Sequence, residues 1–542
     1  MMMANWATCA ENVRGERSTM AENEQRAGRR RRNTAVLAGL ALAGVVAQYV
    51  FLGHYGYFRD ELYYLICSRH LDWGYVDQPP LSILVLRLTR MLFGDSLYAI
   101  RLPAVLCFAS VVFLTGRLAA RMGAGRAGQA LAAVSVLVAP VFLAVGSFFS
   151  MNAIDQVLWV LAAHVLVRIV QGGDRRLWLL FGLVAGLGLQ NKMSMLFLGA
   201  AVAVAILATP LRKDLKSPWL WLGGGLALLL FLPNLAWQAT HGWASFEFMR
   251  NAALYKNTYA PPHLFVRNQI LLMHPVSMLV WLPGVVYGFA GKDGKQYRIF
   301  SMVFVFLVVF FALTNGKTYY LAPAYPMVLA LGGLAWTRFQ NRPLRPFGWL
   351  PKGAAPALLA LLLLGGAALA PMALPILPPA QFFRYQAALG IAPPAEEQGQ
   401  TNLAMPQHFA DRFGWPELAA FTAEHYRQLR EADRARCVVF CSDYGRASAV
   451  SFFGEPLGLP QAYAGHNNYY FWGPPPEDTQ VVLALHNDSG REALEAAFES
   501  VEVVGRFDHP HAMPYMHGSP LFLCRGPKQP LAVLWAQVRF FI

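Results

Sequence analysis

Long apolar runs separated by short basic segments dominate this sequence. A helix needs about 20 residues to cross the hydrocarbon core of a bilayer, and eleven runs reach or approach that length. The chain is 56% hydrophobic and only 14% charged, whereas soluble proteins carry about 25% charged residues. We therefore expect a polytopic α-helical membrane protein with about eleven transmembrane helices. The expected spans are residues 34–52, 99–119, 127–146, 152–170, 177–190, 194–210, 218–235, 266–288, 299–314, 319–337 and 353–372.

Basic residues predict the orientation of these spans. Six clusters of Arg and Lys all fall on one side when eleven spans are counted, and loops rich in these residues face the cytoplasm. We therefore expect residues 1–33 to form a cytoplasmic basic tail and the chain after residue 373 to lie outside a bacterial inner membrane. A nucleic-acid-binding protein would gather its net charge of +14 on one face, so we expect no nucleic-acid partner. The clusters are residues 29–32, 117–126, 168–176, 212–216, 292–298 and 338–352.

The C-terminal part of the chain has the pattern of a soluble domain. Residues 373–400 are rich in Pro, Ala and Gln and are predicted to be a linker. In residues 401–542 we expect an α/β domain with strands at 437–441, 481–485 and 520–524 and a helix at 491–500. Cys524 could form a disulfide with Cys437 or Cys441 in an oxidising compartment. Free buried thiols are the alternative.

An acidic pair follows the first expected span. Asp60 and Glu61 lie in an outer loop, residues 53–98, that also contains an amphipathic run expected to form an interfacial helix. A low dielectric and a neighbouring negative charge both raise the pKa of a carboxyl group toward that of a general base. The alternative is an acidic loop in which Glu61 pairs with Arg59. A further carboxylate, Asp77, is held by the Pro79–Pro80 turn in the same loop.

Three more charged residues lie at the expected outer ends of spans. Asp155 is at the outer end of the fourth span, where a carboxylate in or near the membrane is costly and indicates a functional site. The alternative is an aqueous position just outside the bilayer. Lys192 has no acidic neighbour in the sequence, so it either extends to the surface or binds an anion such as a lipid phosphate. Lys317 has a similar position and could also be a plain interface anchor.

The order of these motifs resembles the GT-C glycosyltransferases of the protein O-mannosyltransferase and aminoarabinose-transferase (ArnT) type, also called family 39-like. The resemblance covers roughly residues 34–340, and it implies that residues 34–372 are a GT-C catalytic domain. Gln78 and Asn191 depart from the commonest pattern, in which His and Thr are frequent. The matching stretches are residues 59–64, 77–81, 186–192 and 317–326.

The resemblance also implies roles for individual residues. Asp60 would be the general base, with Glu61 as its acidic neighbour, and Asp155 would be a second acid lining the cavity. Lys192 would lie near the donor phosphate. The other residues assigned to substrate binding are Arg59, Asp77, Lys317, Tyr319, Tyr320 and Tyr325.

The function implied is a glycosyltransferase that moves a sugar from a polyprenyl-phosphate donor, such as an undecaprenyl-phosphate sugar. The acceptor would be a hydroxyl or phosphate of a glycan, lipid or protein on the outer face. A single base without a covalent nucleophile predicts inversion at the anomeric carbon. No cofactor is demanded, although acids near a phosphate could hold a divalent metal. The alternatives are a transporter or lipid flippase, against which the sequence has no repeated halves, and a non-catalytic membrane sensor.

Two stretches of the C-terminal part resemble a domain carried by a bacterial subset of these enzymes. They are residues 443–449 and 465–473, and the second is dense in aromatic and amide side chains. Such a composition is typical of a carbohydrate-binding or loop-contact surface. A polar loop that caps the membrane domain is the equally favoured alternative.

Overall fold

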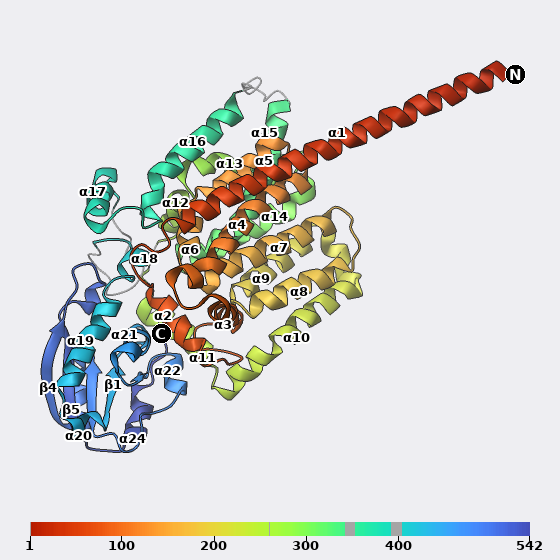
Figure 1. Cartoon of the computed structure of the whole chain (residues 1–542). Helices are drawn as coiled ribbons and strands as arrows, with labels where there is room; N and C mark the ends of the chain where they lie inside the picture. The colour runs from red at the N-terminus through yellow and green to blue at the C-terminus, as the bar shows by residue number, and fades with distance from the viewer. Residues whose placement is uncertain (1, 260, 342–352, 392–403) are drawn as a thin grey trace.

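The computed structural model describes residues 2–259, 261–341, 353–391 and 404–542. A bundle of helices forms one part of the molecule, and a small sheet domain lies against one end of it (Figure 1). The main helices of the bundle are α1 (Met2–Tyr49), α4 (Leu97–Met122), α5 (Arg126–Leu137), α6 (Pro140–Gly146), α7 (Met151–Val170), α8 (Leu177–Leu189), α9 (Ser194–Leu207), α10 (Pro218–Thr240), α12 (Pro262–Leu272), α13 (Met278–Ala290), α14 (Arg298–Leu313), α15 (Tyr325–Asn341) and α16 (Ala354–Leu369).

Each of the eleven expected spans falls on helical structure, and several are bent. Five helices of the described chain are long and apolar enough to cross a membrane, and the number rises to eight if each of three bent pairs is one span. The bends are 60° between α5 and α6, 104° between α9 and the 3-10 helix η1 (Pro210–Lys216), and 100° between α12 and α13. A proline follows each bend, at Pro140, Pro210 and Pro275. Proline lacks an amide hydrogen and clashes with the preceding turn, which accounts for the interruptions.

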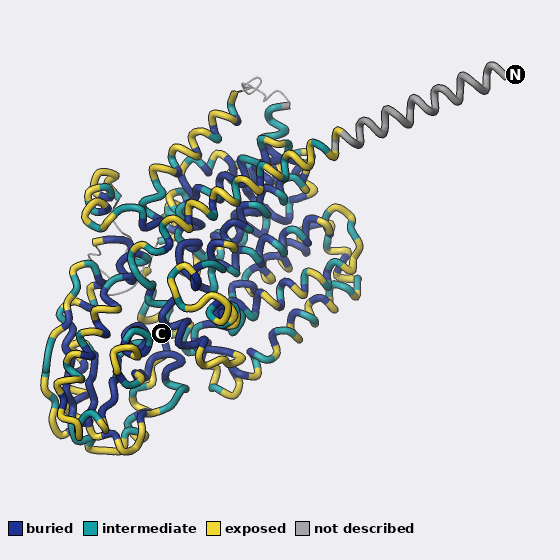
Figure 2. The backbone as a smooth tube through the Cα atoms, in the orientation of Figure 1, coloured by how far each residue is buried: buried dark blue, intermediate teal, exposed yellow. Residues whose placement is uncertain are grey.

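Burial separates central helices from peripheral ones (Figure 2). In the most apolar window of α7, 72% of residues are buried inside the protein, whereas the figure for α10 is 17%. The exposed face of α10 carries Leu228, Leu229 and Leu232. A helix that exposes leucines in this way is suited to lipid contact, so the bundle has the construction of a membrane domain.

Helices α8 and α10 touch through their backbones. A methyl group added at Gly182 would lie 2.0 Å from the carbonyl oxygen of Gly223, and one added at Gly223 would lie 2.2 Å from that of Trp178. Small residues at such crossings let membrane helices approach closely. The contact fixes α8, whose C-terminal end leads into the turn that carries Lys192.

The outer loop expected at residues 53–98 forms two short helices, α2 (Arg59–Cys67) and α3 (Leu81–Phe93). Ile83 and Leu86 of α3 are buried while Leu88 and Leu92 are exposed, so the expected amphipathic helix is present. Helix α2 lies between the bundle and the C-terminal domain (Figure 1). The loop is therefore a contact region between the two parts.

The C-terminal domain contains a five-stranded sheet with strand order β2-β1-β3-β5-β4. Its central strand β3 pairs in parallel with β1 and antiparallel with β5. The three expected strands are confirmed, but the expected helix at 491–500 ends at residue 497, where β4 begins. The strands are β1 (Cys437–Cys441), β2 (Ala462–Tyr463), β3 (Val481–Leu485), β4 (Phe498–Phe507) and β5 (Ser519–Pro527), and the main helices are α19 (Trp415–Gln428), α21 (Tyr444–Phe453) and α23 (Arg491–Ala497).

Two further expectations concern the linker and the cysteines. The predicted linker contains helix α17 (Pro379–Leu389), and its last residues, 392–400, lie outside the described residues. Cys437, Cys441 and Cys524 are buried and unpaired, which favours the free-thiol alternative over a disulfide.

Polar contacts join the two parts of the molecule. The backbone amide of Arg59 donates a hydrogen bond to the carbonyl oxygen of Asp411 at 3.0 Å. The buried guanidinium of Arg412 donates to Ser147 Oγ at 2.7 Å. These contacts fix the C-terminal domain against α2 and the end of α6.

Candidate active site

Asp60 lies in the first turn of α2, facing the C-terminal domain. Its Oδ1 accepts a 2.8 Å hydrogen bond from the hydroxyl of Tyr444, and Arg59 Nε lies 3.7 Å from the same oxygen. The side chain is 36% exposed. Asp60 is therefore oriented by its neighbours and still reachable by a ligand.

Glu61 points the other way, into the protein. It is fully buried and accepts hydrogen bonds from Arg101 Nε at 2.8 Å and Arg101 Nη2 at 2.7 Å. The backbone amides of Phe58 and Phe149 each add a bond of 2.8 Å. The alternative in which Glu61 pairs with Arg59 is wrong, because Arg59 lies 3.8 Å from Asp411 instead. With both its oxygens bonded in this way, Glu61 holds the fold together and does not share a site with Asp60.

Asp77 is the acidic partner of Asp60 in space. Its Oδ1 accepts a 3.1 Å hydrogen bond from the hydroxyl of Tyr63, which lies one turn after Asp60 on α2. Burial and, next, the negative charge of Asp60 raise the pKa of Asp77 from 3.8 to about 7. An acid with a pKa near neutrality can both accept and release a proton at physiological pH.

Lys192 lies in the turn between α8 and α9, directly above the start of α7. Its Nζ donates a 2.6 Å hydrogen bond to Asn152 Oδ1, and it lies 5.6 Å and 5.2 Å from the ring centres of Tyr319 and Tyr320. The turn is also held by Asn191, whose side chain donates to the carbonyl of Met151 at 2.9 Å. Lys192 is thus a positive charge on a rigid support with aromatic rings beside it.

Two charged residues act on Lys192 from neighbouring elements. Asp155, one turn further along α7, accepts a 2.7 Å hydrogen bond from Ser194, and its negative charge attracts Lys192. Lys317 precedes the 3-10 helix η5 (Thr318–Ala324), and its positive charge repels Lys192. Lys192 has no acidic neighbour in the sequence, but the fold brings Asp155 close to it.

Tyr325 differs from the other two tyrosines of its motif. It is fully buried, and its hydroxyl donates a 3.2 Å hydrogen bond to Gln269. Its ring packs edge-on against Phe304 and Trp281, with centroids 5.0 Å and 5.7 Å away. These contacts give Tyr325 a packing role beneath the site.

The acidic and basic groups are joined by one backbone hydrogen bond. The amide of Leu81, four residues after Asp77, donates to the carbonyl of Gln190 at 2.8 Å, two residues before Lys192. Beside this bond the side chain of Gln78 is 2% exposed, and both its polar atoms lack a hydrogen-bond partner among the described residues. The two motifs therefore meet at a buried polar position.

The carboxylates do not form an obvious metal site. Among residues 2–259, 261–341, 353–391 and 404–542, no group of three or more His, Cys, Asp and Glu side chains could hold an ion. Mg²⁺ is commonly bound by one or two carboxylates, with waters and substrate phosphates completing its coordination. The divalent metal that acids near a phosphate could hold therefore stays an open alternative.

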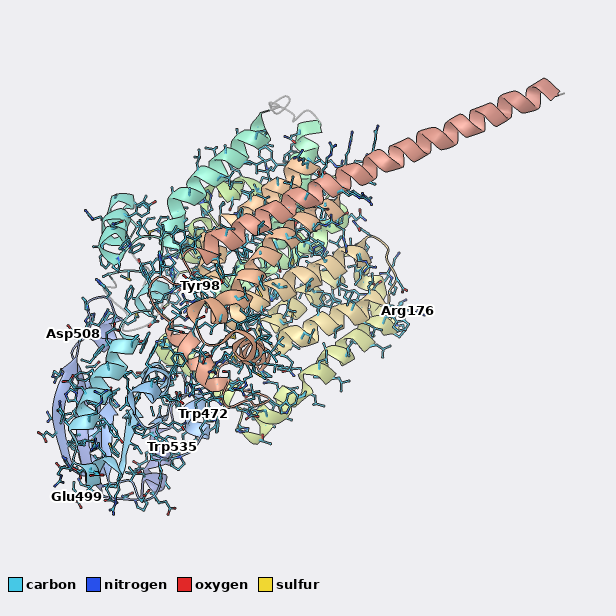
Figure 3. The ribbon with its side chains drawn as sticks, in the orientation of Figure 1. Tyr98, Arg176, Trp472, Glu499, Asp508 and Trp535 are labelled. Atoms are coloured by element: carbon cyan, nitrogen blue, oxygen red, sulfur yellow. The ribbon has the colours of Figure 1, made fainter. Side chains whose placement is uncertain are left out.

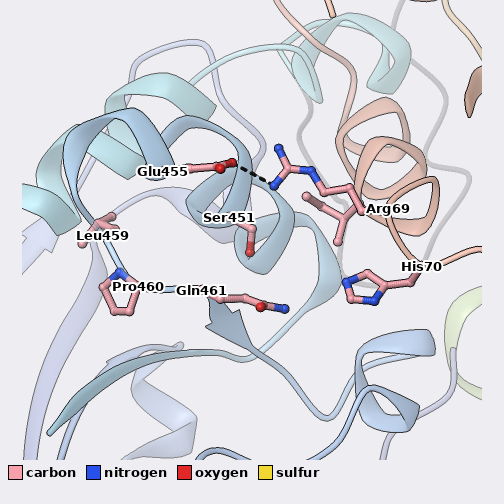
Figure 4. Close-up of a pocket in the computed structure, with 8 residues that line it drawn as sticks. Arg69, His70, Ser451, Glu455, Leu459, Pro460 and Gln461 are labelled. Carbon is pink, nitrogen blue, oxygen red and sulfur yellow. Dashed lines mark hydrogen bonds and ion pairs between the residues drawn. The ribbon is translucent and has the colours of Figure 1, made fainter. Parts of the chain in front are cut away.

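A separate cavity of about 240 Å³ lies at the other end of α2, between the two parts of the molecule (Figure 4). Arg69 and Glu455 form a 2.8 Å ion pair across it. Nearby, the rings of His70 and Trp472 stack at 4.5 Å, and Trp472 lies on the side of the C-terminal domain that faces the bundle (Figure 3). This cavity contains neither Asp60 nor Lys192. Its remaining lining residues are Ile66, His70, Ser451, Leu459, Pro460 and Gln461.

Several residues that build the site were not expected from the sequence. Tyr444 and Asn152 contact Asp60 and Lys192 directly, and Arg101 neutralises Glu61. Asn152 stands three residues before Asp155, one turn along the same helix, so its helical spacing could have indicated it. Tyr444 lies 384 positions from Asp60, and no local pattern connects them.

Comparison with known proteins gives a consistent family relationship. Residues 77–237 match the family model described as dolichyl-phosphate-mannose-protein mannosyltransferase. The chain is 26% identical over 186 residues to the lipid A galacturonosyltransferase RgtD of Rhizobium johnstonii, covering 34% of this chain and 39% of that protein. It is also 26% identical over 302 residues to an undecaprenyl phosphate-alpha-4-amino-4-deoxy-L-arabinose arabinosyl transferase of Sodalis glossinidius, covering 50% of this chain and 53% of that protein. The matches thus span about half of these curated relatives or less.

The fold also matches a solved structure. The crystal structure of ArnT from Cupriavidus metallidurans bound to undecaprenyl phosphate superposes with a TM-score of 0.57 at 16% identity, covering 91% of this chain and all of that one. The apo structure of the same protein gives the same TM-score. The expected fold class is thereby confirmed. The protein has the GT-C fold of a membrane protein and is similar to glycosyltransferases of the ArnT type.

Proposed function

We propose that this protein transfers a sugar from a polyprenyl-phosphate donor to an acceptor hydroxyl or phosphate. The observation that carries the proposal is the hydrogen bond between Leu81 and Gln190, which ties the loop of the two carboxylates to the turn of Lys192. Sugar transfer from a lipid phosphate needs a base for the acceptor and a cation for the leaving phosphate. The bond lies four residues after Asp77 and two residues before Lys192, which supports the two required groups acting together.

The reaction is a single displacement. The acceptor oxygen attacks the anomeric carbon and loses its proton to the carboxylate of Asp60. The bond between the anomeric carbon and the phosphate oxygen breaks, and the phosphate leaves on its lipid with one more negative charge. Lys192 stabilises that charge in a setting where little water screens it. One displacement inverts the anomeric configuration.

Asp77 takes part as the neighbour of Asp60. With a pKa of about 7, Asp77 is partly protonated at physiological pH. It can therefore pass the proton that Asp60 receives on to solution, and its neutral form limits the repulsion between the two acids. Glu61 has no part in this chemistry, because its oxygens are held by Arg101 and two backbone amides.

The site would face the outside of a bacterial inner membrane. Arg176, which belongs to one of the basic clusters, lies at the end of the bundle far from the C-terminal domain (Figure 3). Basic loops face the cytoplasm, so this arrangement supports an outward-facing C-terminal domain and an outward-facing Asp60. The names of the relatives, which refer to lipid A and undecaprenyl phosphate, support a glycolipid of the cell envelope as the acceptor.

The test is transfer by the purified protein in lipid nanodiscs. Undecaprenyl-phosphate donors carrying aminoarabinose, galacturonate or mannose are incubated with lipid A or with envelope glycans, and products are identified by mass spectrometry. We expect one donor to give a product and Asp60→Asn to abolish it. Asp508→Asn is a matched control, because Asp508 is exposed and pairs with His517 far from the site. Unchanged transfer by Asp60→Asn, Asp77→Asn and the double variant would overturn the assignment.

A further inference from the structure

Two loops of the C-terminal domain each reach one of the two carboxylates. Tyr444, at the start of α21, bonds Asp60, and Asn468, at the start of α22 (Asn468–Phe471), supports Asp77 through Tyr63 and Val76. We propose that the C-terminal domain completes the active site, with Tyr444 and Asn468 as positioning residues for Asp60 and Asp77. This inference deepens the proposed function and rests on it.

Tyr444 is held firmly on its own side. Asp443 caps α21 by accepting bonds from the amides of Gly445 and Arg446 at 2.9 Å and 3.0 Å. The ring of Tyr444 packs on that of Tyr63 at 4.7 Å, and the guanidinium of Arg59 lies 5.2 Å from its centre. The contacts of the ring with Tyr63 and Arg59 therefore hold the hydroxyl toward Asp60.

Residue 445 must also be small for this contact to form. A methyl group added at Gly445 would lie 2.7 Å from Arg59 Cγ. Backbone and side chain thus meet at van der Waals distance across the domain boundary, and the start of α21 fits closely onto α2.

Arg446 connects this helix start to the sheet. It is 1% exposed and donates to Ser442 Oγ and Asp443 near β1. It also donates to Tyr515 O at 2.7 Å and Ser519 Oγ at 2.9 Å, at the start of β5. A functional side chain keeps its position when the residues that support it are themselves fixed by hydrogen bonds and packing. The hydrogen bonds of Arg446 fix the start of α21, and with it Tyr444, to β1 and β5.

Asn468 holds the second carboxylate through two bonds. Its Oδ1 accepts a 2.9 Å hydrogen bond from the amide of Val76, the residue before Asp77. Its own amide donates to the hydroxyl of Tyr63 at 3.2 Å, and that hydroxyl donates onward to Asp77 Oδ1. Asn468 is 2% exposed, so water does not compete for these bonds. The backbone of residues 76–77 is thereby fixed from the C-terminal domain.

The charges around the pair make these bonds matter for protonation. A hydrogen bond donated to a carboxylate favours its ionised form, and burial favours the neutral form. Tyr444 orients Asp60 through its hydrogen bond, whereas the fixed, buried position of Asp77 opposes charge on Asp77. The titratable groups facing the pair are Arg59, Tyr63, Tyr64 and Cys67 on α2, Lys256 on the π-helix η2 (Ala252–Lys256) and Tyr444.

The two substitutions therefore act on different carboxylates. In Tyr444→Phe the carboxylate of Asp60 loses the hydrogen bond that orients it. In Asn468→Ala the Asp77 loop loses its anchor and reaches water, so Asp77 loses its proton at lower pH. A general loosening of the domain would expose Asp77 to water in both variants and let it lose its proton at lower pH in each.

The first experiment needs no substrate. Wild-type protein and both variants in nanodiscs are treated with a hydrophobic carbodiimide, which modifies protonated carboxyls, at pH 5 to 9, and labelled peptides are quantified by mass spectrometry. We expect half-maximal labelling of Asp77 near pH 7 in the wild type. Asn468→Ala should lower that midpoint by about one pH unit, as expected for one charged hydrogen bond, whereas Tyr444→Phe should leave it close to wild type. An Asp77 profile in Asn468→Ala identical to wild type would overturn the proposal.

The second experiment measures kcat and KM separately. Tyr444→Phe should lower kcat about tenfold and leave KM for the donor unchanged, because the base loses its orientation while the donor site is untouched. Tyr426→Phe is the control, because its hydroxyl donates to Arg434 O within the C-terminal domain, away from the carboxylates. A changed donor KM with an unchanged kcat would contradict positioning. Shifted labelling in a protein that transfers no sugar would leave the positioning intact and refute the proposed function instead.

Discussion

Glu61 and Arg101 form an ion pair that is fully buried on both sides. Two hydrogen bonds of 2.7 Å and 2.8 Å join them, and Arg101 donates further to the carbonyls of Leu52 at 2.5 Å and Gly56 at 2.6 Å. The pair thus connects α4 with the segment between α1 and α2. Because α2 also carries Asp60, this ion pair sets the position from which Asp60 reaches the site.

Glu61→Gln should destabilise the protein without removing its chemistry. Breaking a buried ion pair by neutralising one partner costs about 3–5 kcal/mol, because the other charge stays buried. We expect a lower thermal unfolding midpoint in detergent and a specific activity of the folded fraction within a few-fold of wild type. A stable Glu61→Gln protein that has lost transfer would show that Glu61 acts in catalysis after all.

Asp60→Asn should remove activity and leave the stability of the protein close to that of wild type. Its carboxylate is partly exposed, so its removal should leave the unfolding midpoint close to wild type. Loss of a general base lowers rates by about 10²- to 10⁴-fold, and we expect kcat to fall in that range. The readings are kcat from product formation and the unfolding midpoint of the same preparation. A variant that unfolds early would contradict the assignment of Asp60 as an accessible base.

Lys192→Ala should weaken the donor interaction. Removing a cation that faces a lipid phosphate costs the charge-assisted contacts it makes, and we expect the Kd for undecaprenyl phosphate to rise about ten- to hundredfold. Lys192→Arg should retain part of the affinity. Arg212→Ala, an exposed basic residue at the other end of α9, is the control. Equal donor affinity in Lys192→Ala and wild type would exclude the phosphate role.

Asp77→Asn should change how stability depends on pH. The pKa of Asp77 is raised from 3.8 to about 7 in the folded protein, so the folded state binds its proton more tightly than the unfolded state does. That contribution is fully present below about pH 4 and is lost as pH rises through 7. A shift of about three units corresponds to at most about 4 kcal/mol. We expect Asp77→Asn to be more stable than wild type at pH 8 and similar at pH 4, as measured by thermal unfolding at both pH values. A variant less stable at pH 8 would contradict this linkage.

The membrane part was largely predictable because apolar runs report directly on lipid contact. The runs at 99–119 and 218–235 correspond to single helices, α4 and α10. The bends after α5, α9 and α12 were harder to foresee, since a proline in an apolar run can lie at a kink, a break or a helix start. An apolar run in the sequence therefore identifies a span more reliably than it shows whether that span is straight or bent.

The site was predictable as far as its motifs are local. Asp60, Asp77 and Lys192 lie in short stretches whose charge stands out against apolar surroundings. Adjacency in sequence was misleading for Glu61, because neighbouring residues on a helix point about 100° apart. Its true partner, Arg101, lies forty residues away on α4. Which acids form a pair is thus decided by tertiary packing, and only the fold reveals Asp77 as the second one.

The contacts between α2 and α21 also bear on how such proteins can be recombined. Residues 53–98 and the C-terminal domain bond each other at Arg59, Val76 and Tyr63, among others. A chimaera joined within residues 373–400 would replace one half of each contact and keep the other. The first loop and the C-terminal domain therefore form one exchangeable module, and a working hybrid must take both from the same parent.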